Sequence, residues 1–229
     1  MNMNTQFKIN SKRGKYAITL LWLIFALEII SLILYISQYQ ILNQNSNENN
    51  VPQSILTFAN NSIDAIGILY TIIYIMSAIA FLMWFRRAYY NLHLKVNHLS
   101  YKESWSLWSW FVPILNLFRP YQIMIELFLH TDILLSKKIK NYQPSHASSL
   151  IGFWWFLWLI SSFFGNYVFR YSSNINSTEE LITSAMLSII NSVIGIGSAL
   201  ITIHLLKIYT KEEPLFYEIN EEKYEAIRA

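Results

Sequence analysis

The sequence alternates long apolar runs with short segments that hold nearly all of its charged residues. Four runs reach the roughly 20 apolar residues that a helix needs to cross the hydrocarbon core of a bilayer. They lie at about 17–38, 63–86, 148–169 and 181–206. Because an isolated strand cannot satisfy its backbone hydrogen bonds in lipid, we expect each run to be a helix. The pattern therefore predicts an all-α integral membrane protein with four transmembrane helices.

The Lys and Arg residues are distributed unevenly over the connections between these runs. Sixteen of the 17 lie before the first run, between the second and third, or after the fourth, and the exception is Arg170. Cytoplasmic connections carry an excess of Lys and Arg. This bias predicts a membrane protein with both termini in the cytoplasm. Residues 1–16 would form a basic cytoplasmic segment, 17–209 the transmembrane domain, and 210–229 an acidic cytoplasmic tail.

The predicted cytoplasmic segment 87–147 contains an apolar, Trp-rich stretch at 105–129. Pro113 and Pro120 interrupt helical hydrogen bonding there, and Arg119 would be costly within lipid. A fifth crossing would also reverse the side of three lysines that follow and remove the charge bias. We expect instead a Pro-broken helical hairpin, either a pair of short interfacial helices or a shallow re-entrant loop, with its turn at 113–116.

Composition excludes several classes of protein. Hydrophobic residues make up 54% of the chain and charged residues 14%, against roughly a quarter charged in soluble proteins, so the chain is not a disordered one. The absence of Cys excludes disulfides, thiolate zinc sites and cysteine nucleophiles. A net charge of +3 gives no global signal for nucleic-acid binding. The five His residues form no i, i+4 pair, and no phosphate-binding loop is present, so no metal or cofactor is predicted.

Aromatic and basic residues gather on the predicted cytoplasmic side, where all eight Trp residues fall. Indole rings suit the headgroup boundary, and guanidinium groups bind phosphate through forked hydrogen bonds. We expect a site for anionic lipid or a protein partner, with simple interfacial anchoring as the alternative. The candidate residues are Arg86, Arg87, Arg119, Trp105, Trp108 and Trp110.

A second group of residues predicts a structural clamp. Trp84, Arg87 and Asn91 are spaced i, i+3, i+7 and share one helix face. Glu126 lies in an otherwise apolar stretch, where a lone carboxylate would be costly. We therefore expect Arg87 and Glu126 to pair and to tie the hairpin to the second span, which we favour over a headgroup site there.

Two features lie within the predicted spans. Glu28 is in the middle of the first, where ionisable residues are rare and suggest a functional role. It is expected either to relay a proton or cation, or to be protonated, or to bond across the bundle to Ser or Asn side chains such as those of Asn191 or Ser192. Small residues form a stripe on the fourth span, which predicts close packing within the bundle or a homo-oligomer seam; they are Ser184, Ser188, Ser192, Gly195, Ala199 and Thr202.

Three motifs resemble an uncharacterised bacterial membrane family, domain of unknown function 4328. They are MWFRRAYYN (83–91), WFVPILNLFRPYQIMIE (110–126) and FWWFLW (153–158). The resemblance spans about 63–209 and implies a multi-span membrane protein, without implying an activity. The matching positions are Trp84, Arg87, Asn91, Pro113, Asn116, Pro120 and Glu126.

The sequence leaves three functional classes open. The favoured one is a non-enzymatic membrane protein that acts through its Trp- and Arg-rich cytoplasmic face on lipid or a partner. A small transporter or channel would use Glu28 as its coupling group. A membrane-embedded, lipid-modifying enzyme would use Glu126, His130 or Asp132 as acid or base, although these residues form no convergent motif.

Overall fold

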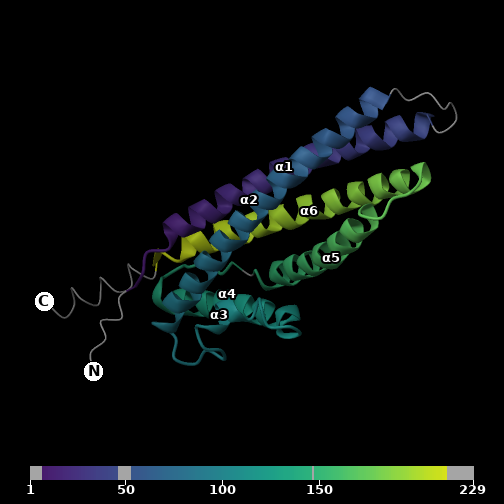
Figure 1. Ribbon diagram of the computed structural model, residues 1–229. Coiled ribbons are helices and arrows are strands. Elements are labelled where there is room, and N and C mark those ends of the chain that lie inside the picture. Colours follow the sequence, from purple (N-terminus) through teal and green to yellow (C-terminus); the bar gives the residue numbers. More distant parts are fainter. Residues whose placement is uncertain (1–6, 46–52, 146, 216–229) are drawn as a thin grey trace, which may run out of the picture. The chain divides into compact units, whose positions relative to one another are not determined.

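The computed structural model describes residues 7–45, 53–145 and 147–215. Its described residues contain helices and no strand, which confirms the predicted all-α class. The elements in chain order (Figure 1) are α1 (Ser11–Asn45), α2 (Gln53–His93), α3 (Trp105–Trp108), the short 3-10 helix η1 (Leu115–Leu117), α4 (Arg119–Lys138), α5 (Ser148–Ser172) and α6 (Thr178–Glu212).

Four of these helices are long and apolar enough to cross a membrane, as the sequence predicts. Their qualifying segments are Ser11–Asn43, Asn61–His93, Ser148–Ser172 and Thr178–Glu212. Each helix is longer than its predicted apolar run. In α2 the extension continues the helix past Arg86 as far as His93, so Arg87 and Asn91 lie on the same rigid element as the apolar run.

The segment between α2 and α5 differs in detail from the expected pair of short helices. α3 is a single turn of four residues, whereas α4 has 20 residues. Pro120 lies in the first turn of α4, where its missing N–H has no helical partner to lose. It therefore begins a helix and does not break one. Pro113 and Ile114 lie in a turn before η1, and the φ angle of Ile114 is 67°.

The chain divides into two units that are described separately. Unit 1 comprises residues 1–19, 77–155 and 203–229, and unit 2 comprises 20–76 and 156–202. Unit 1 holds α3, η1 and α4 together with one end of each long helix. Its fully buried side chains include Trp84, Phe85, Tyr89, Trp154 and Tyr209, so large aromatic residues form much of its core.

Candidate functional site

Asn91 of α2 holds the segment that precedes α1. Its side-chain amide donates to the Lys8 carbonyl (2.9 Å) and accepts from the Lys8 N–H (3.2 Å). Asn10 is fastened about two turns away along α2, where its amide donates to the Trp84 carbonyl (3.2 Å). These buried contacts fix the backbone of residues 8–10 along α2. The Lys8 side chain is therefore placed beside the basic residues of α2.

Gly14 allows α1 to approach α6 closely within unit 1. A Cβ atom at this position would lie 2.7 Å from the Thr210 hydroxyl oxygen and 3.3 Å from the Trp84 ring. Any larger residue would push the first turns of α1 outward. The close approach brings Arg13 to the edge of α2, where its guanidinium donates to the Met83 carbonyl (3.1 Å).

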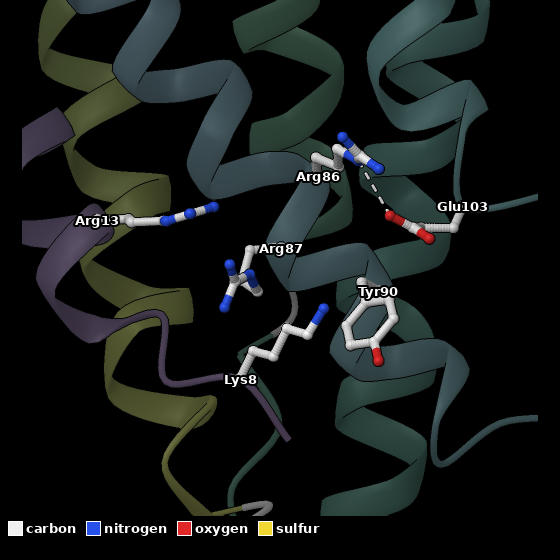
Figure 2. A pocket seen from close by; sticks show the side chains of 6 residues that line it. All are labelled: Lys8, Arg13, Arg86, Arg87, Tyr90 and Glu103. Atoms are coloured by element: carbon white, nitrogen blue, oxygen red, sulfur yellow. Dashed lines mark hydrogen bonds and ion pairs between the residues drawn. The ribbon is translucent and has the colours of Figure 1, made fainter. Parts of the chain in front are cut away.

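These contacts assemble a pocket of about 260 Å³ with a strongly basic lining. Figure 2 shows the side chains of Arg13, Arg87 and Lys8 converging from α1, α2 and the preceding segment. We call the pocket and its lining residues the basic pocket. The lining residues are Lys8, Arg13, Arg86, Arg87, Tyr90 and Glu103.

The charges in the basic pocket are unbalanced. Glu103 is its single acidic residue, and it pairs with Arg86 at 3.0 Å (Figure 2). The Lys8 ammonium lies 4.5 Å from the centre of the Tyr90 ring, a favourable cation–π arrangement. Arg87 makes no hydrogen bond or ion pair with the part of the chain that the structure describes. Arg86 and Arg87 also repel Arg13 as like charges. The arrangement favours an anion.

Arg119, Trp105 and Trp108 do not line the basic pocket with Arg86 and Arg87. The Arg119 guanidinium lies over the Tyr101 ring at 4.3 Å and near the Trp105 ring at 5.9 Å. Trp108 is 59% exposed, next to the turn that holds the exposed Ile114. The six residues of the predicted lipid site are thus divided among a pocket, a cation–aromatic stack, an exposed apolar loop and a buried aromatic cluster.

Trp110 lies in this aromatic cluster of unit 1. Its ring centre is 5.6 Å from that of Phe81 and 5.8 Å from that of Trp155, both edge to face. The Trp155 indole donates to the Leu117 carbonyl at 2.9 Å. These contacts join α2, α5 and the turn before α4, so Trp110 supports the fold where the sequence predicted a ligand contact.

Glu126 is joined to α2 through Tyr89, where the sequence predicted Arg87. Glu126 of α4 accepts hydrogen bonds from the Tyr89 hydroxyl and from the Ser100 backbone N–H (2.6 Å). No Arg87–Glu126 ion pair occurs in the described part of the chain, so that predicted pairing is wrong. The face that carries Trp84, Arg87 and Asn91 meets the segment before α1, whereas Tyr89 projects from a different side of α2 toward α4.

The other members of the predicted clamp have local roles. Pro113 precedes the turn, where its carbonyl accepts the Leu115 N–H at 2.8 Å, and Pro120 is buried at the start of α4. The Asn116 backbone N–H donates to the Val112 carbonyl at 3.0 Å.

Asp132 fastens the segment between α4 and α5. It accepts hydrogen bonds from the Tyr142 hydroxyl (2.7 Å), the Ser145 hydroxyl (3.0 Å) and the Ser145 N–H (3.1 Å). Burial and the neighbouring Asp132 raise the pKa of the Tyr142 hydroxyl. The same Tyr142 hydroxyl lies 3.1 Å from the Glu212 carboxyl. Asp132 and Glu126 therefore serve separate structural networks and do not converge on one point.

Glu213 is a buried carboxyl behind the basic pocket. It is 2% exposed and accepts a hydrogen bond from the Asn91 amide at 2.7 Å. Burial raises the pKa of Glu213 to about 7, although its bonds to Asn91 and Asn10 and the charge of Arg87 favour the ionised form. Asn91 thereby links the end of α6 to the segment that carries Lys8.

Glu28 lies in unit 2, where it is 4% exposed and hydrogen-bonded to Tyr70 and Ser192. Of the two partners that the sequence suggested, it uses Ser192. A Cβ atom on Gly195 would overlap the Glu28 carboxyl, and Ser188 bonds to Tyr35. These members of the small-residue stripe therefore pack against α1 inside unit 2. Homo-oligomerisation through Ser188, Ser192, Gly195 and Ala199 stays a prediction.

Four long apolar helices and a helical segment with a basic pocket define a multi-pass helical membrane protein. Residues 47–211 match the family Domain of unknown function (DUF4328), and the chain belongs to this family. The match confirms the resemblance seen in the three sequence motifs. No curated protein and no solved structure matches the chain.

Several residues of the pocket and its supports were missed from the sequence. The sequence analysis used Lys8 and Arg13 only to predict the membrane orientation. It assigned no role to Glu103, Asn10 or Glu213. Basic residues before an apolar run are common in membrane proteins, so their pattern does not indicate a site. The i, i+4 spacing of Arg87 and Asn91 was the available signal, because one face then carries both a cation and a buried amide.

Proposed function

We propose that this protein binds the headgroup of an anionic lipid in the basic pocket, at the cytoplasmic face of a bacterial inner membrane. The observation that carries the proposal is that Lys8, Arg13, Arg86 and Arg87 line one pocket, whose single carboxylate, Glu103, is already paired with Arg86. Four cations held this close repel one another, and a bound phosphate relieves that repulsion. Guanidinium groups also match phosphate oxygens in geometry.

The volume of the pocket supports a compact ligand. About 260 Å³ lies just below the range of about 300–1,000 Å³ that is typical of small-molecule sites. A single phosphate headgroup suits this space better than a large organic ligand does. Because the ligand would extend from the pocket into the lipid layer, its acyl chains need no cavity in the protein.

The loop around Ile114 supports a membrane-facing position for this part of unit 1. Trp108, Phe111 and Ile114 are 59%, 62% and 73% exposed. A β-branched residue with a positive φ angle is unfavourable, and at this exposure little packing within unit 1 offsets the cost. Burial in the headgroup layer would supply that packing, as it does for other interfacial aromatic and aliphatic side chains.

The test compares two triple variants of the full-length protein in detergent. Lys8→Gln, Arg13→Gln and Arg87→Gln together remove pocket cations. Lys137→Gln, Lys138→Gln and Lys140→Gln remove three cations outside the pocket. Each lost cation near an anionic surface costs about 1 kcal/mol, so the pocket variant is expected to bind anionic phospholipid about a hundredfold more weakly. The control variant should retain wild-type affinity.

Binding is measured as the lipid concentration that gives half of the maximal thermal stabilisation. Zwitterionic phospholipid and inorganic phosphate are assayed in parallel, because phosphate alone would reveal a site for the free ion. Equal loss of binding in both triple variants would contradict the proposal, since it would reduce the effect to general surface charge. Equal stabilisation of the wild type by zwitterionic and anionic lipid would contradict it as well.

A further inference from the structure

The Glu28 side chain is buried among polar groups in unit 2, and the lipid-binding proposal gives it no role. The carboxyl is 4% exposed and hydrogen-bonded to Tyr70 of α2 and Ser192 of α6. Gly195 leaves room for it on α6, because a Cβ atom there would overlap the carboxyl. Three helices therefore combine to enclose one acidic group in the apolar part of the protein.

No Lys or Arg pairs with Glu28 among the described residues of unit 2. Arg170 is the one Lys or Arg in the sequence of unit 2, and its side chain lines a different pocket with Glu180. The titratable groups around the carboxyl are Tyr35 on α1 and Tyr70 and Tyr74 on α2, with Asp64 acting on Tyr35. α6 contributes hydroxyl groups. An ionised carboxylate without a cation is costly at this depth, so the site favours the form that carries a proton.

Hydroxyl groups lead from Glu28 toward the start of α6. Ser184, Ser188 and Ser192 are spaced by four residues, and they are 6%, 6% and 2% exposed. The four-residue spacing places successive hydroxyls on one face, about 6 Å apart. Each faces a polar group of another helix: Ser184 is hydrogen-bonded to Ser172 at 2.7 Å, Ser188 interacts with Tyr35, and Ser192 interacts with Glu28. We call these three serines and their partners the hydroxyl ladder.

The hydroxyl ladder has the dimensions of a proton path. A step of about 6 Å equals two hydrogen bonds of about 2.8 Å in series, so proton transfer between neighbouring serines requires one water molecule between them. Ser184, the serine farthest from Glu28, is bonded to Ser172, an exposed residue at the end of α5. Ser192 lies 14 residues beyond Thr178, or about 21 Å along the helix. The hydroxyl ladder therefore extends from an exposed residue at the end of α5 to the middle of α6.

We propose that Glu28 is a reversible proton-binding site within the membrane, which exchanges protons with the water phase near the start of α6 through the hydroxyl ladder. When the carboxyl releases its proton, the proton passes along the serine and tyrosine hydroxyls to water. The carboxylate that remains is held by Tyr70 and Ser192. This activity is independent of the basic pocket, which lies in unit 1.

The first experiment detects the proton on Glu28 by infrared spectroscopy of the full-length protein in lipid. A protonated carboxyl gives a carbonyl band that a carboxylate lacks. Subtracting the infrared spectrum of Glu28→Gln from that of the wild type assigns the band to Glu28. We expect this band at neutral pH and its reversible disappearance at alkaline pH. Ser192→Ala should move the same band by removing a hydrogen bond, which provides the assignment if Glu28→Gln does not fold.

The second experiment follows the path by deuterium exchange of that band after transfer to heavy water. Ser184→Ala removes the rung next to the exposed end and should slow exchange by at least about tenfold, the effect of losing one bridging hydrogen bond of about 1.4 kcal/mol. Ser162→Ala is the matched control, because its exposed hydroxyl bonds back to the Trp158 carbonyl on α5. This control should exchange at the wild-type rate.

Three results would overturn the proposal. The absence of a Glu28 carbonyl band at neutral pH would mean that the carboxyl is ionised. A band that neither titrates nor exchanges would mean that the proton is permanently structural. Exchange at the wild-type rate in Ser184→Ala would mean that protons do not use the hydroxyl ladder.

Discussion

The hydroxyl of Tyr89 donates a hydrogen bond to the carboxylate of Glu126, and this contact joins α2 to α4. The two side chains are 0% and 8% exposed. Glu126 also accepts the Ser100 N–H, so one carboxylate fixes both the long helix α4 and the connection that leaves α2.

Loss of this contact should destabilise unit 1. A hydrogen bond to a charged group contributes about 1.5–3 kcal/mol, and Tyr89→Phe and Glu126→Gln should each lower the free energy of unfolding by an amount in this range. Because the two residues touch, the double variant should cost less than the sum of the single variants. Chemical denaturation in detergent measures these values. The pair Arg87→Gln and Glu126→Gln should be additive, and strict additivity of the Tyr89 pair would contradict the contact.

The orientation can be tested with single cysteines, because the native chain contains none. Ser173→Cys lies in the exposed connection between α5 and α6, and Lys138→Cys at the exposed end of α4. With a cytoplasmic basic face, an impermeant thiol reagent added to intact cells should label position 173 and not position 138. After the membrane is permeabilised, both positions should react. Labelling of position 138 in intact cells would place the basic pocket on the outer side.

Glu213 should make stability depend on pH. Its pKa is about 7 in the folded protein and about 4.5 in the unfolded chain, so the folded state binds the proton more tightly. The resulting stabilisation is fully present below about pH 4.5 and is lost as the pH rises to about 7, a difference on the order of 3 kcal/mol. Thermal unfolding at about pH 5 and about pH 8 should show this loss.

Glu213→Gln provides the comparison, since glutamine stays neutral and its amide oxygen can still accept from Asn91. The variant should lose less stability than the wild type does between the two pH values. An identical pH dependence in both proteins would mean that Glu213 titrates at its ordinary pKa in the folded state.

Trp108 and Trp110 should respond differently to the membrane. Trp108 is 59% exposed on the apolar loop, whereas Trp110 packs against Phe81 and Trp155. A quencher attached to the lipid headgroups should reduce the Trp fluorescence of the wild type. This quenching should be weaker when Trp108 is replaced by Phe. Trp110→Phe should leave that quenching unchanged and lower the thermal stability of the protein. Equal quenching in the wild type and Trp108→Phe would mean that the loop does not reach the headgroup layer.

The sequence by itself determined the elements that depend on local composition. A predominantly apolar run of about 20 residues is long enough to span lipid only as a helix, which accounts for the four long helices. Pro113 indicated an interruption of the helix because proline restricts the backbone regardless of its surroundings, and it lies outside the helices. Pro120 was misread as a break, because proline has opposite effects at the first turn and in the interior of a helix.

The tertiary structure decided which polar groups meet. Arg87 and Glu126 are opposite in charge, and the sequence paired them on that ground, but the face of α2 that carries Arg87 meets the segment with Lys8 and Asn10 instead. Tyr89, two residues further on, occupies the side toward α4. The basic pocket likewise joins Lys8 and Arg13 to α2 residues far away in the sequence, through the amide of Asn91 and the small Gly14. Such contacts depend on how helix faces are rotated against one another, and local composition does not encode that rotation.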